Sequence, residues 1–312
     1  MTTVDSAAPA PGVPPVGATA PAPTAPAPTA PVRSDGRIRS RWAPYVTAAR
    51  YLALFALACF FLMPVYALLI TALKTPVEVS VVSMWRWPHT FSIENFRIVW
   101  PKLQDGFVNS TLLAVPASII SSVLGAANGF VLSKWRFPGA DFIFPLILFG
   151  MFIPYQAILI PMFQTVSAAG LKGGLDGLIL VHIIYGLPIT TLIFRSYFAG
   201  ISDELIEASK VDGAGMLRTF FFVALPIAPP AFAVSLIWQF TSTWNDFLFG
   251  VLLTNKDSWP ITVALNNIAG SQAVPFNEAM ASALLASLPT LLVYVLLGRF
   301  FMRGLMAGAL KG

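Results

Sequence analysis

Long runs of apolar residues restrict this chain to very few kinds of fold. The run at residues 51–73 contains no charged side chain, and comparable runs recur up to the C-terminus. An α-helix rises about 1.5 Å per residue, so about 20 residues cross a hydrocarbon layer of about 30 Å. Hydrophobic residues make up 56% of the chain, charged residues only 11%, and the mean hydropathy is +0.75, which excludes an ordinary soluble domain. The chain is predicted to be an all-α polytopic membrane protein.

Six segments are predicted to cross the membrane: residues 51–73, 107–133, 142–164, 177–198, 226–253 and 281–301. Residues 74–106 carry too many charges to span and are predicted to form an external loop with interfacial helices. Arginines precede the first span at positions 33, 37, 39, 41 and 50. Positively charged segments remain on the cytoplasmic side, so both termini are predicted to be cytoplasmic in a multi-pass protein of the inner or plasma membrane.

Three regions follow from this reading. Residues 1–50 form a Pro/Ala-rich cytoplasmic tail that ends in the basic cluster, residues 51–303 form the six-helix membrane domain, and residues 304–312 form a cytoplasmic C-terminal tail. The first 31 residues consist largely of Ala, Pro, Thr and Val, and such a composition offers too little apolar surface to order a chain. This stretch is therefore predicted to be disordered.

Deletion of residues 2–30 is expected to leave insertion and assembly of the protein in the membrane unchanged, because this stretch has no apolar face or periodicity with which to pack. The membrane level of the shortened chain, measured by immunoblot, and its recovery as an assembled protein check this expectation. Loss of assembly would show that the stretch binds a partner.

Residues 201–230 are the one polar segment between apolar spans that is dense in charges, glycines and prolines. Ser202 is a favourable helix N-cap, and the acids that follow it suit the first turn of a helix. Gly213 supplies the backbone conformation that often ends a helix. A second short helix is predicted at residues 216–224, and Pro229 suits the first turn of the next span. The segment is predicted to be a helix-turn-helix elbow outside the membrane.

This elbow resembles the "EAA" loop of ABC-importer permeases. The matching residues are Glu207, Ala208, Ser209, Asp212, Gly213, Ala214, Leu225 and Pro226. Ser209 departs from the third alanine of the family pattern. The resemblance implies the type I ABC importer fold, with the elbow as the cytoplasmic coupling helix that docks on an ATPase. Small side chains at Ala208, Ser209 and Gly213 would let a partner approach closely. A membrane-surface amphipathic helix or a plain loop is the alternative.

The C-terminus carries a second resemblance. Its residues Arg303, Gly304, Gly308, Lys311 and Gly312 match the terminal pattern of carbohydrate-importer permeases, in the branch typified by the inner maltose-permease subunit. The resemblance implies that this tail contacts the ATPase dimer, although a frayed end would have a similar composition.

A third resemblance concerns the cargo and the partners. The sequences WPITVALNN at residues 259–267 and AGSQ at residues 269–272 look most like permeases of glucose/mannose-type importers. The resemblance implies a carbohydrate permease, with a monosaccharide favoured over a disaccharide. It further implies a second, homologous permease subunit in a heterodimer, two ATP-binding subunits that hold ATP and Mg²⁺, and an extracytoplasmic sugar-binding protein.

Polar side chains within the spans are the candidates for contact with substrate, because polar groups in a membrane are costly unless they face protein or water. The richest group lies on the fifth span. The candidates are Asn128, Tyr155, Gln156, Trp238, Gln239, Trp244, Asn245 and Asp246. Amides and carboxylates suit pairs of hydroxyls, and aromatic faces suit the apolar face of a sugar ring. Hydrogen bonding between helices is the alternative, and His182 is interpreted as a packed polar residue.

The sequence contains no recognisable catalytic machinery. It has no Gly-rich loop that ends in Gly-Lys-Ser/Thr, no metal-spaced His/Cys cluster and a single cysteine, Cys59. We therefore expect a non-enzymatic chain with no cofactor or metal of its own and no nucleic-acid partner. The alternative function is an ion-coupled secondary transporter of a small polar solute. Such a protein needs buried ionisable residues, and only Asp246 and Arg195 lie near spans.

Overall fold

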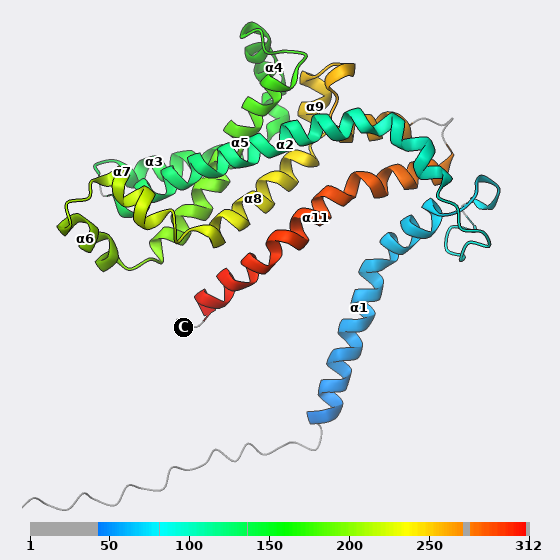
Figure 1. The fold of residues 1–312 in the computed structure, drawn as a ribbon, viewed down its shortest axis with the longest axis horizontal. Coiled ribbons are helices and arrows are strands. Elements are labelled where there is room, and N and C mark those ends of the chain that lie inside the picture. The colour runs from blue at the N-terminus through cyan, green and yellow to red at the C-terminus, as the bar shows by residue number, and fades with distance from the viewer. Residues whose placement is uncertain (1–42, 81, 136, 271–274, 310–312) are drawn as a thin grey trace, which may run out of the picture. The chain divides into compact units, whose positions relative to one another are not determined.

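The computed structural model describes residues 43–80, 82–135, 137–270 and 275–309, with the backbone alone for residues 43–44 and 301–309 (Figure 1). The chain divides into two units, residues 1–58 and 59–312. The first unit contributes the beginning of helix α1 (Ala43–Ala72), which continues into the second. Of the predicted tail at residues 1–50, residues 1–42, which include four of its five arginines, lie outside the described residues. Residues 43–50 belong to α1, so that part of the predicted tail is helical instead.

The described part of the chain is helical, as predicted, and its only β contact is an isolated bridge between Gly173 and Thr254. After α1 the main helices are α2 (Glu94–Lys134), α3 (Ala140–Phe149), α4 (Leu159–Ala168), α5 (Leu175–Ala199), α6 (Asp203–Val211), α7 (Met216–Thr219), α8 (Pro229–Trp244), α9 (Leu248–Leu253), α10 (Ile261–Ala269) and α11 (Phe276–Ala309). Short helical turns lie at Pro76–Glu78, Gly150–Phe152, Tyr155–Ile158, Phe220–Ala224 and Lys256–Ser258.

By length and apolar character, four of the described helices can each cross a membrane: α1, α2, α5 and α11. Two further pairs of helices qualify only if each bent pair counts as one span, which gives up to six. These pairs are Ala140–Phe152 with Tyr155–Ala168, and Met216–Ala224 with Pro229–Trp244. The chain is thus a multi-pass membrane protein, and within the described residues six is the upper count of spans.

The third predicted span is not one continuous helix. Its two halves meet at an angle of 88°. The break follows the short turn at Gly150–Phe152 and contains Pro154, which has no backbone N–H to donate to the preceding turn. The span predicted at residues 142–164 is therefore bent, and it remains a candidate span only if the two helices count as one.

The helix that contains the second span begins before the predicted start of that span. Helix α2 starts at Glu94, within the segment assigned to an external loop, and continues to Lys134 without interruption. Charges exclude this early part from the hydrocarbon layer but do not prevent helix formation, so a helix can extend beyond the membrane. An ion pair of 3.0 Å between Lys102 and Glu278 joins its N-terminal part to the start of α11.

The loop before α2 is held by a buried polar network. Lys74 is 2% exposed and donates from Nζ to the Ser83 carbonyl oxygen at 2.6 Å. Asn95 donates to the carbonyl oxygens of Ala72 and Lys74, and Asn277 donates to Asn95 Oδ1 at 2.6 Å. The pKa of Lys74 is lowered from its ordinary value, because the effect of burial exceeds the opposite effect of the nearby negative charge of Glu78. This network fixes the end of α1 against α2 and α11.

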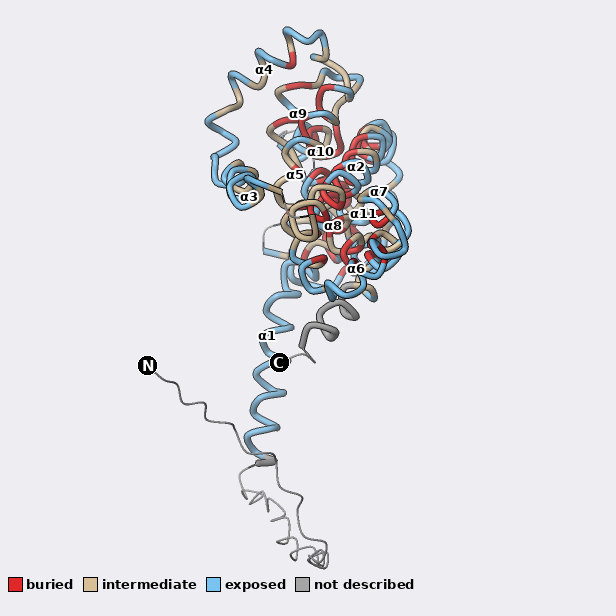
Figure 2. The backbone as a smooth tube through the Cα atoms, turned by 90° about the vertical axis from the view of Figure 1, so that its left-hand side faces the viewer, coloured by how far each residue is buried: buried red, intermediate tan, exposed pale blue. Residues whose placement is uncertain are grey.

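The core of the second unit forms where α2, α5 and α8 pack together (Figures 1 and 2). Small residues on α2 permit a very close approach to α5. A Cβ atom on Gly129 would lie 2.6 Å from the Arg195 backbone nitrogen, and one on Gly125 would lie 2.8 Å from the Thr190 carbonyl carbon. In contrast, residues 59–66 of α1 are exposed, which leaves a long apolar surface for lipid or another subunit (Figure 2).

Candidate functional site

The elbow folds as the sequence predicted. Ser202 occupies the N-cap position of α6, although its side chain makes no capping hydrogen bond. Gly213 has a φ of +79°, a left-handed conformation that side chains rarely adopt, and it ends the turn after α6. Helix α7 and the π-helical turn at Phe220–Ala224 follow, and α8 begins with Pro229 in its first turn.

The predicted docking residues do not share one exposed surface. Glu207, Ala208, Asp212 and Gly213 are exposed, whereas Ser209 is 8% exposed. The Ser209 hydroxyl donates to the Ile206 carbonyl oxygen at 2.7 Å and lies 3.0 Å from the Thr219 hydroxyl. The expectation that Ser209 belongs to the exposed docking surface is therefore corrected: its small side chain lets α6 pack against α7.

The remaining coupling candidates are placed as follows. Ala214 and Leu225 are half-buried and Pro226 is exposed. At the C-terminus, Arg303, Gly304 and Gly308 lie within α11, which extends to Ala309, beyond the predicted end of the sixth span. Lys311 and Gly312 lie outside the described residues.

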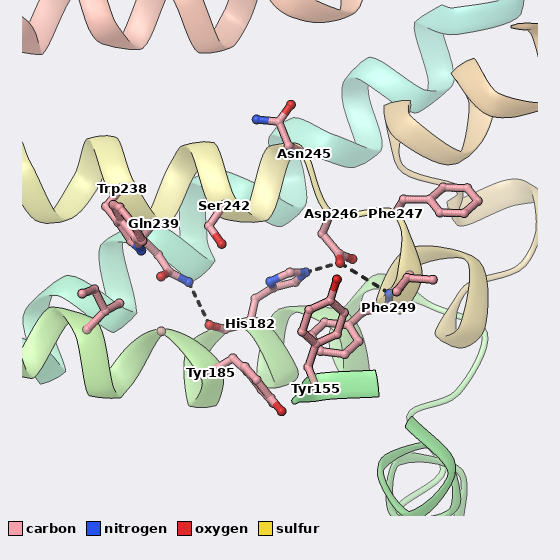
Figure 3. Close-up of a pocket in the computed structure, with 13 residues that line it drawn as sticks. Tyr155, His182, Tyr185, Trp238, Gln239, Ser242, Asn245, Asp246, Phe247 and Phe249 are labelled. Carbon is pink, nitrogen blue, oxygen red and sulfur yellow. Dashed lines mark hydrogen bonds and ion pairs between the residues drawn. The ribbon is translucent and has the colours of Figure 1, made fainter. Parts of the chain in front are cut away.

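A cavity of about 360 Å³ lies between α5, α8, α9 and the turn that contains Tyr155 (Figure 3). It is located at two interruptions of the helices: the break in the third span and the junction of α8 with α9. The lining residues are Tyr155, His182, Tyr185, Gly186, Ile189, Trp238, Gln239, Ser242, Asn245, Asp246, Phe247, Leu248 and Phe249. Its volume falls within the range of about 300–1,000 Å³ that is usual for small-molecule sites.

Polar groups fix one wall of this cavity. The Asp246 carboxylate accepts a hydrogen bond of 3.0 Å from the Gly250 backbone N–H, and its Oδ2 atom lies 3.5 Å from His182 Nε2. The His182 side chain is 6% exposed, and its Nε2 atom makes no hydrogen bond within the described residues. Gln239 donates from Nε2 to the His182 carbonyl oxygen at 2.9 Å. These contacts join α5 to the α8–α9 junction.

Aromatic rings form much of the remaining wall. The Phe249 ring contacts Tyr155, His182 and Tyr185 with centroid distances of 5.5, 5.7 and 5.3 Å, all edge to face. Trp238 is 55% exposed, so a large part of its indole is free to contact a ligand. The cavity thus combines aromatic faces with amide, carboxylate and hydroxyl groups.

Five of the eight predicted substrate residues meet at this cavity: Tyr155, Trp238, Gln239, Asn245 and Asp246. Three do not. Trp244 is 2% exposed, and its indole N–H donates to the Ala286 carbonyl oxygen at 2.9 Å, so its contacts are with the core. Asn128 lies 3.5 Å from the Thr191 hydroxyl on α5, and Gln156 is exposed outside the lining.

Sequence reasoning missed the contribution of α5 to the cavity. His182, Tyr185, Gly186 and Ile189 all line it and occupy positions i, i+3, i+4 and i+7, which lie on one helix face. This spacing was a usable signal. Gly186 allows the close packing of Gln239, since a Cβ atom there would lie 2.5 Å from the Gln239 amide. No group of three His, Cys, Asp or Glu residues that could hold a metal ion occurs among the described residues.

The fold is that of the membrane subunits of ABC importers. A chain of a bacterial ABC transporter involved in import of the acidic polysaccharide alginate superposes with a TM-score of 0.71 at 22% identity, over 84% of this chain and 98% of that chain. A chain of the MetNI methionine transporter gives a TM-score of 0.54 at 18% identity, over 67% of this chain and 98% of that chain.

Residues 117–306 match the family described as binding-protein-dependent transport system inner membrane component, and the chain belongs to that family. A probable ABC transporter permease of Pyrococcus horikoshii is 40% identical, over 84% of this chain and 96% of the relative. The xylose/arabinose import permease of Haloferax volcanii is 34% identical over 79% of this chain and 87% of the relative. The glucose import permease of Saccharolobus solfataricus is 32% identical over 85% of this chain and 95% of the relative.

Proposed function

We propose that this chain is a transmembrane permease subunit of a binding-protein-dependent ABC importer that takes up a carbohydrate. The observation that carries the proposal is the cavity at the α8–α9 junction, where aromatic rings and hydrogen-bonding groups face the same space. An aromatic face covers the apolar face of a sugar ring, while amides and carboxylates bind its hydroxyls. Relatives named for glucose and for xylose/arabinose import support the same substrate class.

The cargo is proposed to be a monosaccharide such as glucose or mannose. Two relatives with names that specify monosaccharides cover most of this chain. The cavity volume of about 360 Å³ is at the lower end of the usual range for small-molecule sites, which favours a small ligand.

The mechanism needs partners. A second, homologous permease subunit completes the pathway in a heterodimer, and an extracytoplasmic sugar-binding protein delivers the ligand. Two ATP-binding subunits, which hold ATP and Mg²⁺, dock at the exposed residues of the elbow on the cytoplasmic side. When the ATP-binding subunits close on ATP, the cavity switches from opening to the cytoplasm to opening to the outside. This chain supplies the pathway and the docking surface, and hydrolysis takes place in the partners.

Transport by the complete complex in proteoliposomes tests this function. Radiolabelled glucose, mannose, xylose and maltose are supplied with the binding protein, and uptake is expected to require ATP inside and to stop with vanadate. Uptake that needs an ion gradient and no ATP would support the alternative, a secondary transporter, in which the largely buried pair of His182 and Asp246 would bind the coupling ion.

Replacing Asp246 by asparagine is expected to lower transport about tenfold while the complex still assembles. Asparagine retains an oxygen that can accept the Gly250 N–H, so the α8–α9 junction should persist. The charge beside His182 is lost, and with it the strongest acceptor for sugar hydroxyls. Initial uptake rates measure the loss, which corresponds to about 1.4 kcal/mol.

The matched control is Asp257→Asn, because Asp257 is an exposed acid outside the cavity. It should transport at the unaltered rate. If Asp246→Asn fails to assemble, Asp246 is a structural residue and its proposed contact with substrate is refuted.

A further inference from the structure

Lys134, the last residue of α2, has an unusual environment for a lysine at the end of a helix. Its side chain is only 4% exposed. The ammonium group donates to the Ile201 carbonyl oxygen at 2.6 Å and to Asp203 Oδ1 at 2.5 Å. Ile201 and Asp203 lie on either side of the N-cap of α6. One buried ammonium group therefore binds the residues on both sides of the N-cap, where the chain enters the elbow.

The next residue of the chain provides a second attachment. Lys210, in the last turn of α6, places its Nζ atom 4.9 Å from the centroid of the Trp135 ring. A cation over an indole face is attracted by the negative potential of the ring. The two attachments hold both ends of α6, and they enclose a cavity of about 430 Å³ whose lining includes Ile206 and Glu207.

The N-terminal half of α2 is attached in the same way, to the segment at residues 257–261. Asn109 donates to the carbonyl oxygens of Asp257 and Trp259 at 3.1 Å each, and Ser110 accepts the Ile261 backbone N–H at 2.8 Å. At 41 residues, α2 is about 60 Å long, and it is continuous between these contacts and Lys134. One helix thus connects the elbow to the segment that starts α10.

We propose that Lys134 is a positioning residue for coupling: it transmits movement of the elbow to α2. The inference rests on the proposed function, in which an ATPase subunit docks on the elbow. Through Lys134, a displacement of α6 moves the end of α2, and α2 carries the movement to α5 and α8, which line the substrate cavity.

The contacts of Lys134 fix a position as well as a charge. The Asp203 side chain is 71% exposed, so its carboxylate is screened by water, whereas the Lys134 side chain is only 4% exposed. The Ile201 carbonyl, in contrast, is a fixed backbone point. A buried cation that binds it determines the position of α6 relative to α2.

The test compares the complete transporter complex with variants at both ends of α2. Lys134→Met removes the charge and keeps most of the side-chain length, Lys134→Arg keeps the charge, and Lys102→Met is the matched control at the external Lys102–Glu278 pair. Three quantities are measured: co-purification of the ATPase subunits, basal ATPase rate, and stimulation of that rate by the sugar-loaded binding protein.

The Lys134→Met complex is expected to retain the ATPase subunits and the basal ATPase rate. Stimulation of that rate by the sugar-loaded binding protein is expected to fall at least fivefold. Lys134→Arg should recover most of it, and Lys102→Met should match the unaltered protein. Asp203→Asn leaves the Lys134–Ile201 hydrogen bond in place, so a partial loss is expected, and the double variant Lys134→Met/Asp203→Asn should equal Lys134→Met alone.

Several results would overturn the inference. Normal stimulation in Lys134→Met, loss of the ATPase subunits from that variant, or equal losses in Lys102→Met would each exclude a specific role in transmission. If Lys134→Met does not fold, Asp203→Asn decides, and full stimulation there rejects the role. Failure of the proposed function is distinguishable, because the unaltered complex itself would then show no stimulation by any sugar-loaded binding protein.

Discussion

Replacing Gly213 by aspartate is expected to abolish coupled transport while the subunit remains folded in the membrane. The residue has a φ of +79°, is exposed, and has no other atom within 4 Å of the position of a Cβ atom. Aspartate tolerates the left-handed conformation better than most residues, so the strain is about 1–2 kcal/mol. A carboxylate at the tip of the turn would instead hold a docked ATPase away from the elbow.

The measurements are membrane insertion, co-purification of the ATPase subunits and sugar-stimulated ATPase activity. Gly170→Asp is the matched control, because Gly170 has a φ of +72° and equally open surroundings in the turn between α4 and α5. It carries the same backbone strain at a different place. Normal uptake and ATPase stimulation in Gly213→Asp would remove this turn from the docking surface.

Replacing Gly129 by leucine is expected to prevent the correct packing of α2 on α5. Even a Cβ atom at this position would lie 2.7 Å from Phe194 Cβ and 2.8 Å from the Phe194 carbonyl carbon. Backbone atoms cannot rotate away as the end of a side chain can, so the helices must separate. Overpacking of this kind costs typically about 1–3 kcal/mol, and more where backbone must shift. Thermal stability in detergent and the yield of monodisperse protein measure the effect.

Gly298→Leu is the control for this substitution, since Gly298 lies in α11 and no described atom outside its own stretch of helix is within 4 Å of a Cβ position. Both changes place leucine inside an apolar helix, and of the two glycines Gly129 is the one that faces another helix at close range. Comparable losses in the two variants would contradict the packing explanation.

The elbow was the most predictable part of the structure, because its signals are local. Ser202, Gly213 and Pro229 each act through the conformation of their own backbone, and all three occupy the expected positions. The orientation of Ser209 was not predictable in this way. It depends on where Thr219 lies after the turn, which is a matter of tertiary packing.

The cavity was predictable in part. Trp238, Ser242 and Asn245 are spaced at i, i+4 and i+7, which is one face of a helix, and all three line the cavity. The same periodicity turns Trp244 to another face, so its core position could have been inferred. Tyr155 was predicted as a candidate, but its position beside Phe249 depends on the 88° bend, which the sequence did not predict. The residue spacing on α5 indicated one helix face, but which helix that face contacts depends on how α5 packs on α8.

The break in the third span has a consequence for how tightly this cavity can hold a solute. Interrupted backbone leaves amide groups without helical partners, and within a membrane such groups are tolerated only inside protein or beside water. We therefore expect a cavity bordered by Tyr155 at that break and by the α8–α9 junction to hold water before a solute arrives. Each hydroxyl that enters exchanges one set of hydrogen bonds for another, with little net gain in free energy. Residence in this cavity should accordingly be brief.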